Sequence, residues 1–142
     1  MTQRMFETLS EAECFELIGG EVVGRFVFQD VDGPAAVPVN FGLAGKEILF
    51  RTEQASHLRE VLNGPVAFEI DLTDPNTGSG WSVLVRGVGR EVELDRLPEL
   101  MRRAGKTLPY PWGEGVHNVW VSIIPRKVTG RRLTTPFVPA IF

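Results

Sequence analysis

Hydrophobic and polar residues alternate along most of this chain, in short runs separated by turn residues. In the run from Val22 to Phe28, Phe26 and Phe28 fall on one side of an extended chain, and Arg25 and Val27 fall on the other. Comparable runs occupy residues 35–41, 47–51, 66–72, 80–94, 117–124 and 127–133. Because these runs are short and joined by hairpin-type turns, they predict a closed antiparallel barrel, a mainly β fold with peripheral helices.

Three segments carry the longer period of an α-helix. Ser10 and Glu13 have the spacing of a capping box, so the first helix is expected to begin there. A second is expected to start between Gln54 and Ser56 and to end at Asn63, where Gly and Pro follow. The third spans about 95–105, with its first residue, an aspartate, as the cap.

Length and composition fit one globular domain. The 142 residues, 43% of them apolar and 23% charged, are enough for a single core, so residues 1–142 are expected to form one domain. Residues 1–7 are expected to be a loose arm. The tail 134–142 is apolar and is expected to dock on its own domain or on a partner subunit.

Charge and residue usage exclude several classes of function. A net charge of −3 argues against non-specific binding to nucleic acid, which needs a basic surface. No apolar run approaches the roughly 18–20 residues that span a bilayer, and no secretory leader is visible, so a cytoplasmic protein is expected. Cys14, His57 and His117 lack the spacing of a zinc site, and a single cysteine forms no internal disulfide. We therefore expect no metal.

The chemistry with the clearest pattern lies where the run 47–51 ends. Phe50, Arg51 and Thr52 come directly before a predicted helix that has Ser56 and His57 in its first turn. A guanidinium, hydroxyl groups and the free N–H groups of a helix start together suit a phosphate-sized anion. The simpler alternatives are a surface cation for Arg51 and a plain helix cap for Ser56.

Two acidic residues share one face of the run 66–72. Glu69 and Asp71 are two positions apart, so both side chains leave an extended chain on the same side. They are either a solvated face or the partners of an arginine across the sheet or across a dimer seam. The sequence leaves both alternatives open.

Several motifs, in this order, resemble those of the pyridoxamine 5′-phosphate oxidase-like split-barrel flavoproteins, and in particular their small bacterial flavin-nucleotide-binding branch. They are Val-Gly-Arg-Phe-Val-Phe (23–28), Val-Pro-Val-Asn-Phe (37–41), Ile-Leu-Phe-Arg-Thr (48–52), Ser-His-Leu (56–58), Val-Ala-Phe-Glu-Ile-Asp (66–71) and Gly-Trp-Ser-Val-Leu-Val-Arg-Gly (80–87). The resemblance covers residues 8–133. It implies a six-stranded split barrel that binds FMN at a homodimer interface.

The resemblance also implies which residues touch the cofactor. The phosphate would lie at the strand end and helix start already described, and the flavin ring would lie along one strand segment and against a second one, often from the other subunit. These ring contacts are Val37, Pro38, Val39 and Asn40, then Trp81, Ser82 and Val83. From the residues alone, Pro38 could equally mark a barrel bulge, and Trp81 could be ordinary barrel packing.

These expectations point to an FMN-binding protein that acts as an oxidoreductase on an unidentified small molecule. The sequence contains no Gly-x-Ser-x-Gly elbow, P-loop or dinucleotide fingerprint, and with FMN the redox chemistry would belong to the cofactor. Vitamin B6 oxidase activity is not expected, because the chain is short and lacks a clear match to that enzyme's C-terminal segment. The alternatives are the same fold binding deazaflavin F420, haem or another tetrapyrrole, or a flavin-binding module without catalysis.

Overall fold

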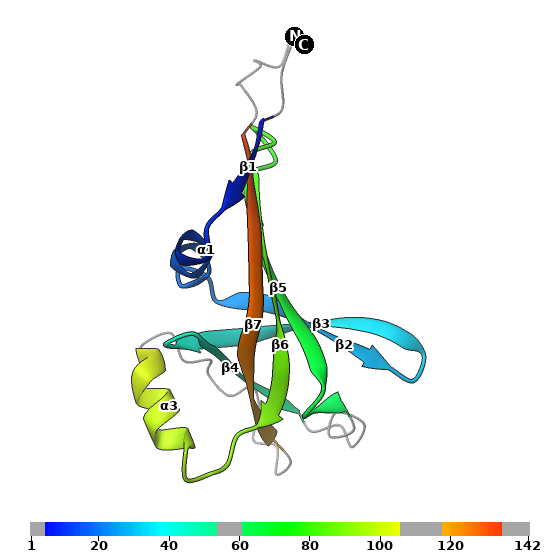
Figure 1. Ribbon diagram of the computed structural model, residues 1–142, viewed down its shortest axis with the longest axis vertical. Coiled ribbons are helices and arrows are strands. Elements are labelled where there is room, and N and C mark those ends of the chain that lie inside the picture. The colour runs from blue at the N-terminus through cyan, green and yellow to red at the C-terminus, as the bar shows by residue number, and fades with distance from the viewer. Residues whose placement is uncertain (1–4, 54–60, 106–117, 135–142) are drawn as a thin grey trace.

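The computed structural model describes residues 5–53, 61–105 and 118–134, and most of them lie in strands (Figure 1). In chain order the elements are β1 (Met5–Leu9), α1 (Glu11–Ile18), β2 (Val23–Asp30), β3 (Gly33–Ala44), β4 (Glu47–Glu53), β5 (Pro65–Thr73), β6 (Gly80–Glu91), α3 (Leu97–Ala104) and β7 (Asn118–Thr134). The mainly β fold with peripheral helices is therefore confirmed.

Six of the strands close into a ring. The order of neighbours is β7, β4, β3, β2, β5 and β6, and β6 pairs again with β7, each pair being antiparallel. The predicted six-stranded split barrel is confirmed. Strand β1 adds to the outside of this ring by pairing with the last residues of β7, from Met5 opposite Thr134 to Leu9 opposite Gly130.

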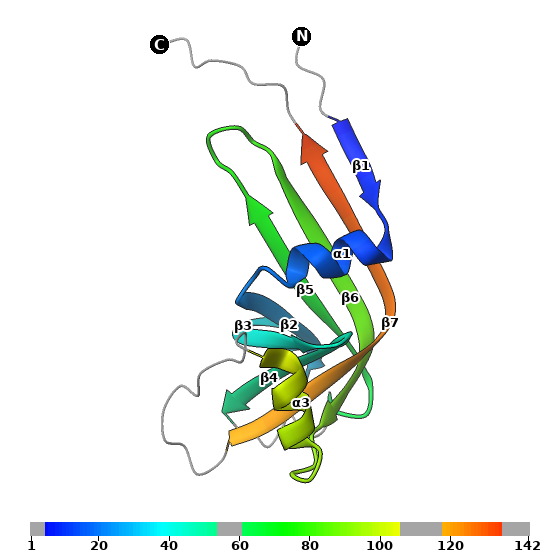
Figure 2. The same cartoon turned by 90° about the vertical axis from the view of Figure 1, so that its left-hand side faces the viewer.

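Strand β7 is the longest element and connects the two ends of the molecule (Figure 2). Its first half pairs with β4, its last part pairs with β1, and β6 follows it along nearly its whole length. The sequence predicts two separate pieces here, because Pro125 cannot donate a ladder hydrogen bond. In the structure Pro125 lies opposite Gly87, at a register shift between Arg86 and Gly87. Because the ladder is already irregular at this point, the proline is accommodated and the strand continues past it.

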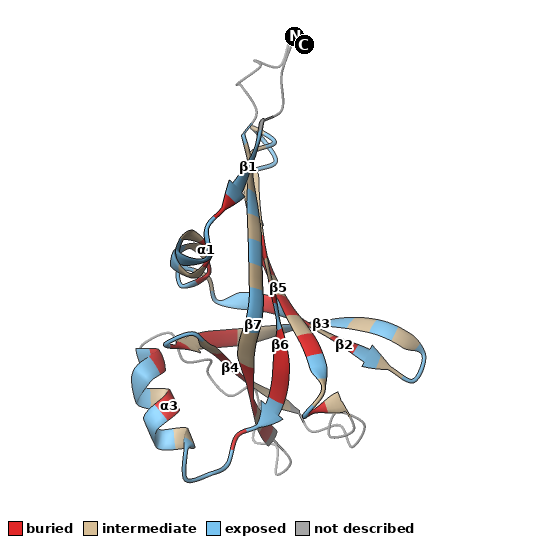
Figure 3. Cartoon of the chain, viewed as in Figure 1, coloured by how far each residue is buried: buried red, intermediate tan, exposed pale blue. Residues whose placement is uncertain are grey.

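Aromatic side chains fill the barrel. Phe26, Phe41, Phe50 and Phe68 are buried (Figure 3). The ring centroid of Phe50 lies 5.0 Å from that of Phe26 and 5.7 Å from that of Phe68. A second cluster outside the ring joins Leu100 and Ala104 of α3 to Ala44 and Leu49 of the sheet. Burying these large side chains removes about 25 cal/mol of unfavourable hydration per Å² of apolar surface. The two clusters bury Leu49 and Phe50 and so fix the end of β4, where the candidate site begins.

Two local predictions need correction, and one is confirmed. The last part of the expected loose arm belongs to β1, because its backbone is paired to β7. Helix α3 has Arg96 as its N-cap, without a side-chain cap bond, so Asp95 does not cap it. The capping box of α1 is present: Ser10 Oγ accepts from the Glu13 amide at 3.2 Å, and Glu13 Oε1 accepts from the Ser10 amide at 3.1 Å.

Candidate functional site

The C-terminal end of β4 presents the predicted phosphate-binding residues. Phe50 is fully buried in the barrel, while Arg51 and Thr52 are half-buried. Arg51 lies opposite Trp120 of β7, with its guanidinium carbon 5.9 Å from the indole centroid. The Nε atom of Arg51 is buried and has no hydrogen-bond partner among the residues that the structure describes. A buried donor without a partner costs about 1–3 kcal/mol, so this atom is suited to an acceptor supplied by a ligand.

The predicted ring segment of β3 lies beside this strand end. Strands β3 and β4 pair from Ala44 opposite Glu47 to Phe41 opposite Phe50. Asn40 directly precedes Phe41, and Arg51 directly follows Phe50, so these two residues lie at the point where the pairing ends. Before Phe41, β3 pairs with β2 alone within the described part of the chain. Among the described residues, one edge of the segment 37–40 is therefore unpaired and could accept a ligand. The structure brings these residues and the end of β4 together.

The other predicted ring segment lies far from the end of β4 in the same chain. Ser82 of β6 pairs with Arg131, whereas Arg51 pairs with Trp120, and these two partners are eleven residues apart on β7. At about 3.3 Å per residue this is roughly 36 Å of strand. Figure 2 shows β4 and the start of β6 at opposite ends of β7. One copy of the chain thus holds the predicted site in two separate parts.

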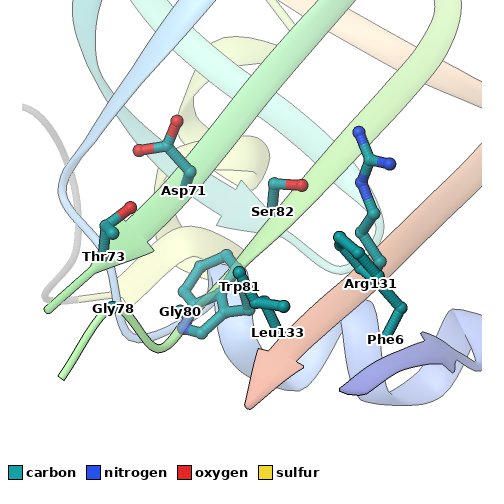
Figure 4. Close-up of a pocket in the computed structure, with 9 residues that line it drawn as sticks. All are labelled: Phe6, Asp71, Thr73, Gly78, Gly80, Trp81, Ser82, Arg131 and Leu133. Carbon is teal, nitrogen blue, oxygen red and sulfur yellow. The ribbon is translucent and has the colours of Figure 1, made fainter. Parts of the chain in front are cut away.

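A pocket of about 300 Å³ marks this second part (Figure 4). Its lining residues are Phe6, Asp71, Thr73, Gly78, Gly80, Trp81, Ser82, Arg131 and Leu133. Asp71, Ser82 and Arg131 point to the outer face of the sheet, and Trp81 points to the opposite side, as adjacent residues of a strand must. Val83 is 1% exposed and belongs to the core, so only its backbone could meet a ligand.

An ion-paired group lies between the two predicted ring segments. Arg25 Nη1 is 3.1 Å from Glu69 Oε2 and 3.5 Å from Asp71 Oδ2. Arg25 of β2 lies opposite both Pro38 of β3 and Glu69 of β5, and Asp71 lies opposite Ser82. Of the two alternatives for the acidic residues, the arginine across the sheet is confirmed.

The environment of Glu69 changes its acidity. Partial burial raises the pKa of the Glu69 carboxyl, the neighbouring Asp71 raises it further through a hydrogen bond and its charge, and Arg25 opposes both. The sequence pattern finds the two acids but not Arg25, because strand register decides which cation is opposite them. Trp120 beside Arg51 is a second contact that only the register reveals.

Part of the predicted site cannot be placed. Ser56 and His57 lie outside the described residues, as does His117. In the described ranges no group of three or more His, Cys, Asp and Glu side chains could hold a metal ion. Of the helices in those ranges, none has the length and apolar character needed to cross a membrane.

Comparison with known proteins gives consistent matches over nearly the whole chain. A family model described as pyridoxamine 5′-phosphate oxidase matches residues 10–132. An uncharacterized protein of Mycobacterium tuberculosis is 31% identical over an alignment of 131 residues that covers 88% of this chain and 84% of that protein. A solved FAD binding protein from Mycobacterium smegmatis is 35% identical with a TM-score of 0.75, covering 90% of this chain and 98% of that one.

More distant structures share the fold alone. A FAD and heme binding protein from Mycobacterium smegmatis is 15% identical, with a TM-score of 0.66 over 89% of this chain and 73% of that chain. A FAD-binding protein from Mesorhizobium loti is 17% identical, with a TM-score of 0.72, and the match covers 93% of this chain and 99% of that chain. The barrel is thus common to proteins whose sequences have diverged widely.

Proposed function

The chain belongs to the pyridoxamine 5′-phosphate oxidase family, and from this premise we propose that it binds a flavin nucleotide at a site shared by two copies of the chain. The observation that carries the proposal is the buried Nε of Arg51, which has no partner in the described structure and lies beside an open strand edge. The similar Mycobacterium smegmatis protein, a FAD binding protein, supports a flavin as the ligand.

The end of β4 fits the phosphate of the flavin. Arg51 supplies a fixed positive charge, held by Trp120 on one side, and charge-assisted hydrogen bonds to a phosphate are about twice as strong as neutral ones. The hydroxyl of Thr52 is on the next residue. FMN and FAD both contain the phosphate next to the ribityl chain. We therefore assign the flavin mononucleotide portion to this site, with FMN as the expected cofactor and FAD as the form to distinguish from it.

Two copies of the chain would complete the site. Arg51 and Ser82 pair with residues eleven positions apart on β7, and Figure 2 shows β4 and the start of β6 at opposite ends of that strand. A partner copy can bring the outer face of its own β6, at Ser82, to the ring while the first copy holds the phosphate. Val22, Val23 and Val37 are 57%, 55% and 41% exposed, so a partner copy could cover these apolar side chains. These features support a homodimer.

The chemistry would come from the cofactor. A flavin exchanges electrons with a small-molecule substrate, and the protein binds, orients and shields it. In this chain Arg51 would fix the phosphate, the backbone of 37–40 would lie along the ring, and the apolar surface around Val37 would exclude water. We propose flavin-dependent oxidoreduction of a small molecule as the activity.

The proposal is tested by loading the purified protein with cofactor. An absorption spectrum and mass spectrometry of the material released by heat identify a bound flavin and separate FMN from FAD. Titration of the apoprotein with FMN, FAD, F420 and hemin then ranks the four ligands. We expect a flavin to bind most tightly, whereas tighter binding of F420 or hemin, or no binding of any flavin, would contradict the proposal.

A further inference from the structure

The group formed by Arg25, Glu69 and Asp71 contains two carboxyls and one guanidinium. A single nitrogen, Arg25 Nη1, lies within 3.1 and 3.5 Å of the two carboxyls, so one cation serves both. If both carboxyls are ionised, one negative charge is left without compensation inside the group. The side chains are 51%, 26% and 40% exposed in that order, so water now solvates part of this charge.

The surroundings offer limited further compensation. On the outer face, Arg86 of β6 and Arg131 of β7 line one pocket of about 380 Å³ together with Ser82. Strand β3 contributes Pro38, which is uncharged and directly opposite Arg25. Asp71 also lines the neighbouring pocket with Ser82 and Arg131. Within the described residues, then, the cations near this pair are Arg25, Arg86 and Arg131, and Arg25 alone forms an ion pair with it.

We propose that Glu69 and Asp71 hold one shared proton when a ligand covers this face, so that flavin binding is coupled to the uptake of a proton. This inference rests on the proposed function, because the predicted ring segments lie on the strands beside the pair, at Pro38 and at Ser82. A flat apolar ring laid over the pair removes water from two carboxyls, and two carboxylates without water repel each other unless one is protonated. Arg25 can compensate only one of them.

The first experiment uses the apoprotein and does not depend on flavin binding. The carboxyl carbons of glutamate are titrated by NMR in the wild type and in Asp71→Asn, with Glu16→Gln on the exposed face of α1 as control. We expect Asp71→Asn to lower the pKa of Glu69, because burial would remain while the neighbouring negative charge is lost. A Glu69 titration unchanged by Asp71→Asn would overturn the idea of an interacting pair.

The second experiment measures the FMN affinity as a function of pH in the wild type and in Glu69→Gln. One linked proton changes an affinity by at most about tenfold per pH unit. The phosphate of FMN titrates equally in both proteins, so the difference between their curves isolates Glu69. We expect the wild type to gain affinity relative to Glu69→Gln as the pH falls, and calorimetry in two buffers to show proton uptake by the wild type alone.

The outcomes separate this inference from the proposed function. Parallel curves for the two proteins, with no buffer dependence, would overturn the coupling and leave the flavin site intact. If no flavin binds at any pH, the proposed function fails and the coupling fails with it, while the NMR titration still decides whether the two carboxyls interact.

Discussion

Arg51 and Trp120 face each other across the pair β4–β7, with the guanidinium carbon 5.9 Å from the indole centroid. The indole holds the arginine at the strand end but offers no acceptor to its Nε, which is buried without a partner in the described structure. A cation held in place with an unused donor is what an anion site requires. The proposed phosphate position follows from this pair.

Replacement of Arg51 by alanine should weaken FMN binding roughly ten- to hundredfold, because a charge-assisted hydrogen bond contributes about 1.5–3 kcal/mol. Fluorescence titration of the apoprotein measures the change. Arg126→Ala, which removes an exposed arginine of β7, is the matched control and should bind FMN as the wild type does. Equal loss in both variants would indicate a general charge effect and would contradict a phosphate contact at Arg51.

Mixing two defective variants should restore binding. Arg51→Ala damages the phosphate part, and Ser82→Glu places a charge in the pocket of the ring part. In a dimer that shares its sites, each mixed dimer contains one intact site, so about a quarter of all sites should recover after subunit exchange. The measurement is the flavin bound per chain before and after mixing. If no site recovers although exchange has occurred, the two parts do not come from different subunits.

Substitution of Gly24 by alanine should destabilise the fold by about 1–3 kcal/mol, because the new methyl group would overlap the ring of buried Phe68. Gly20→Ala is the control, since its added atom would meet only a carbonyl oxygen at an ordinary 3.6 Å. Denaturant unfolding measures both variants. A Gly24→Ala protein as stable as the Gly20→Ala protein would show that the barrel interior adjusts at this point.

The capping box of α1 predicts a pH dependence. Hydrogen bonds from the backbone and side chain of Ser10 lower the pKa of Glu13 in the folded protein. A lowered pKa means that the stabilisation is present above the unfolded-state value and is lost as the pH falls through the folded value. Glu13→Ala should lower the free energy of unfolding near neutral pH and lower it less in acid, where the wild-type carboxylate is itself protonated. Thermal unfolding at several pH values checks this, and a constant difference at all pH values would contradict it.

The barrel could be predicted from the sequence because its signals are local. Alternating runs and turn residues mark the strands, and the pattern of Ser10 and Glu13 marks a helix start. Strand β1 could not be found this way, because its pairing partner lies more than a hundred residues away in the chain. The continuity of β7 could not be predicted for a different reason. Pro125 indicates a break in a strand, and only the shifted register opposite Gly87 shows that the strand continues through it.

In the candidate site, too, local motifs could be predicted from the sequence, whereas contacts set by strand pairing could not. The end of β4 is a local motif, and its described residues Phe50, Arg51 and Thr52 lie at one strand end, while Ser56 and His57 lie outside the described residues. The distance between Arg51 and Ser82 is a property of β7, so the sequence could not show that one chain holds the two parts separately. The ion pairs of Arg25 likewise depend on three strands meeting in one register.

A crystal structure of the protein grown with excess FMN tests the central claim most directly. We predict a phosphate oxygen within hydrogen-bond distance of Arg51 Nε in one copy, with the ring beside residues 37–40 of that copy and the outer face of β6, at Ser82, of a second copy against it. A flavin bound elsewhere, or the end of β4 closed by the chain's own side chains and remote from any second copy, would contradict it.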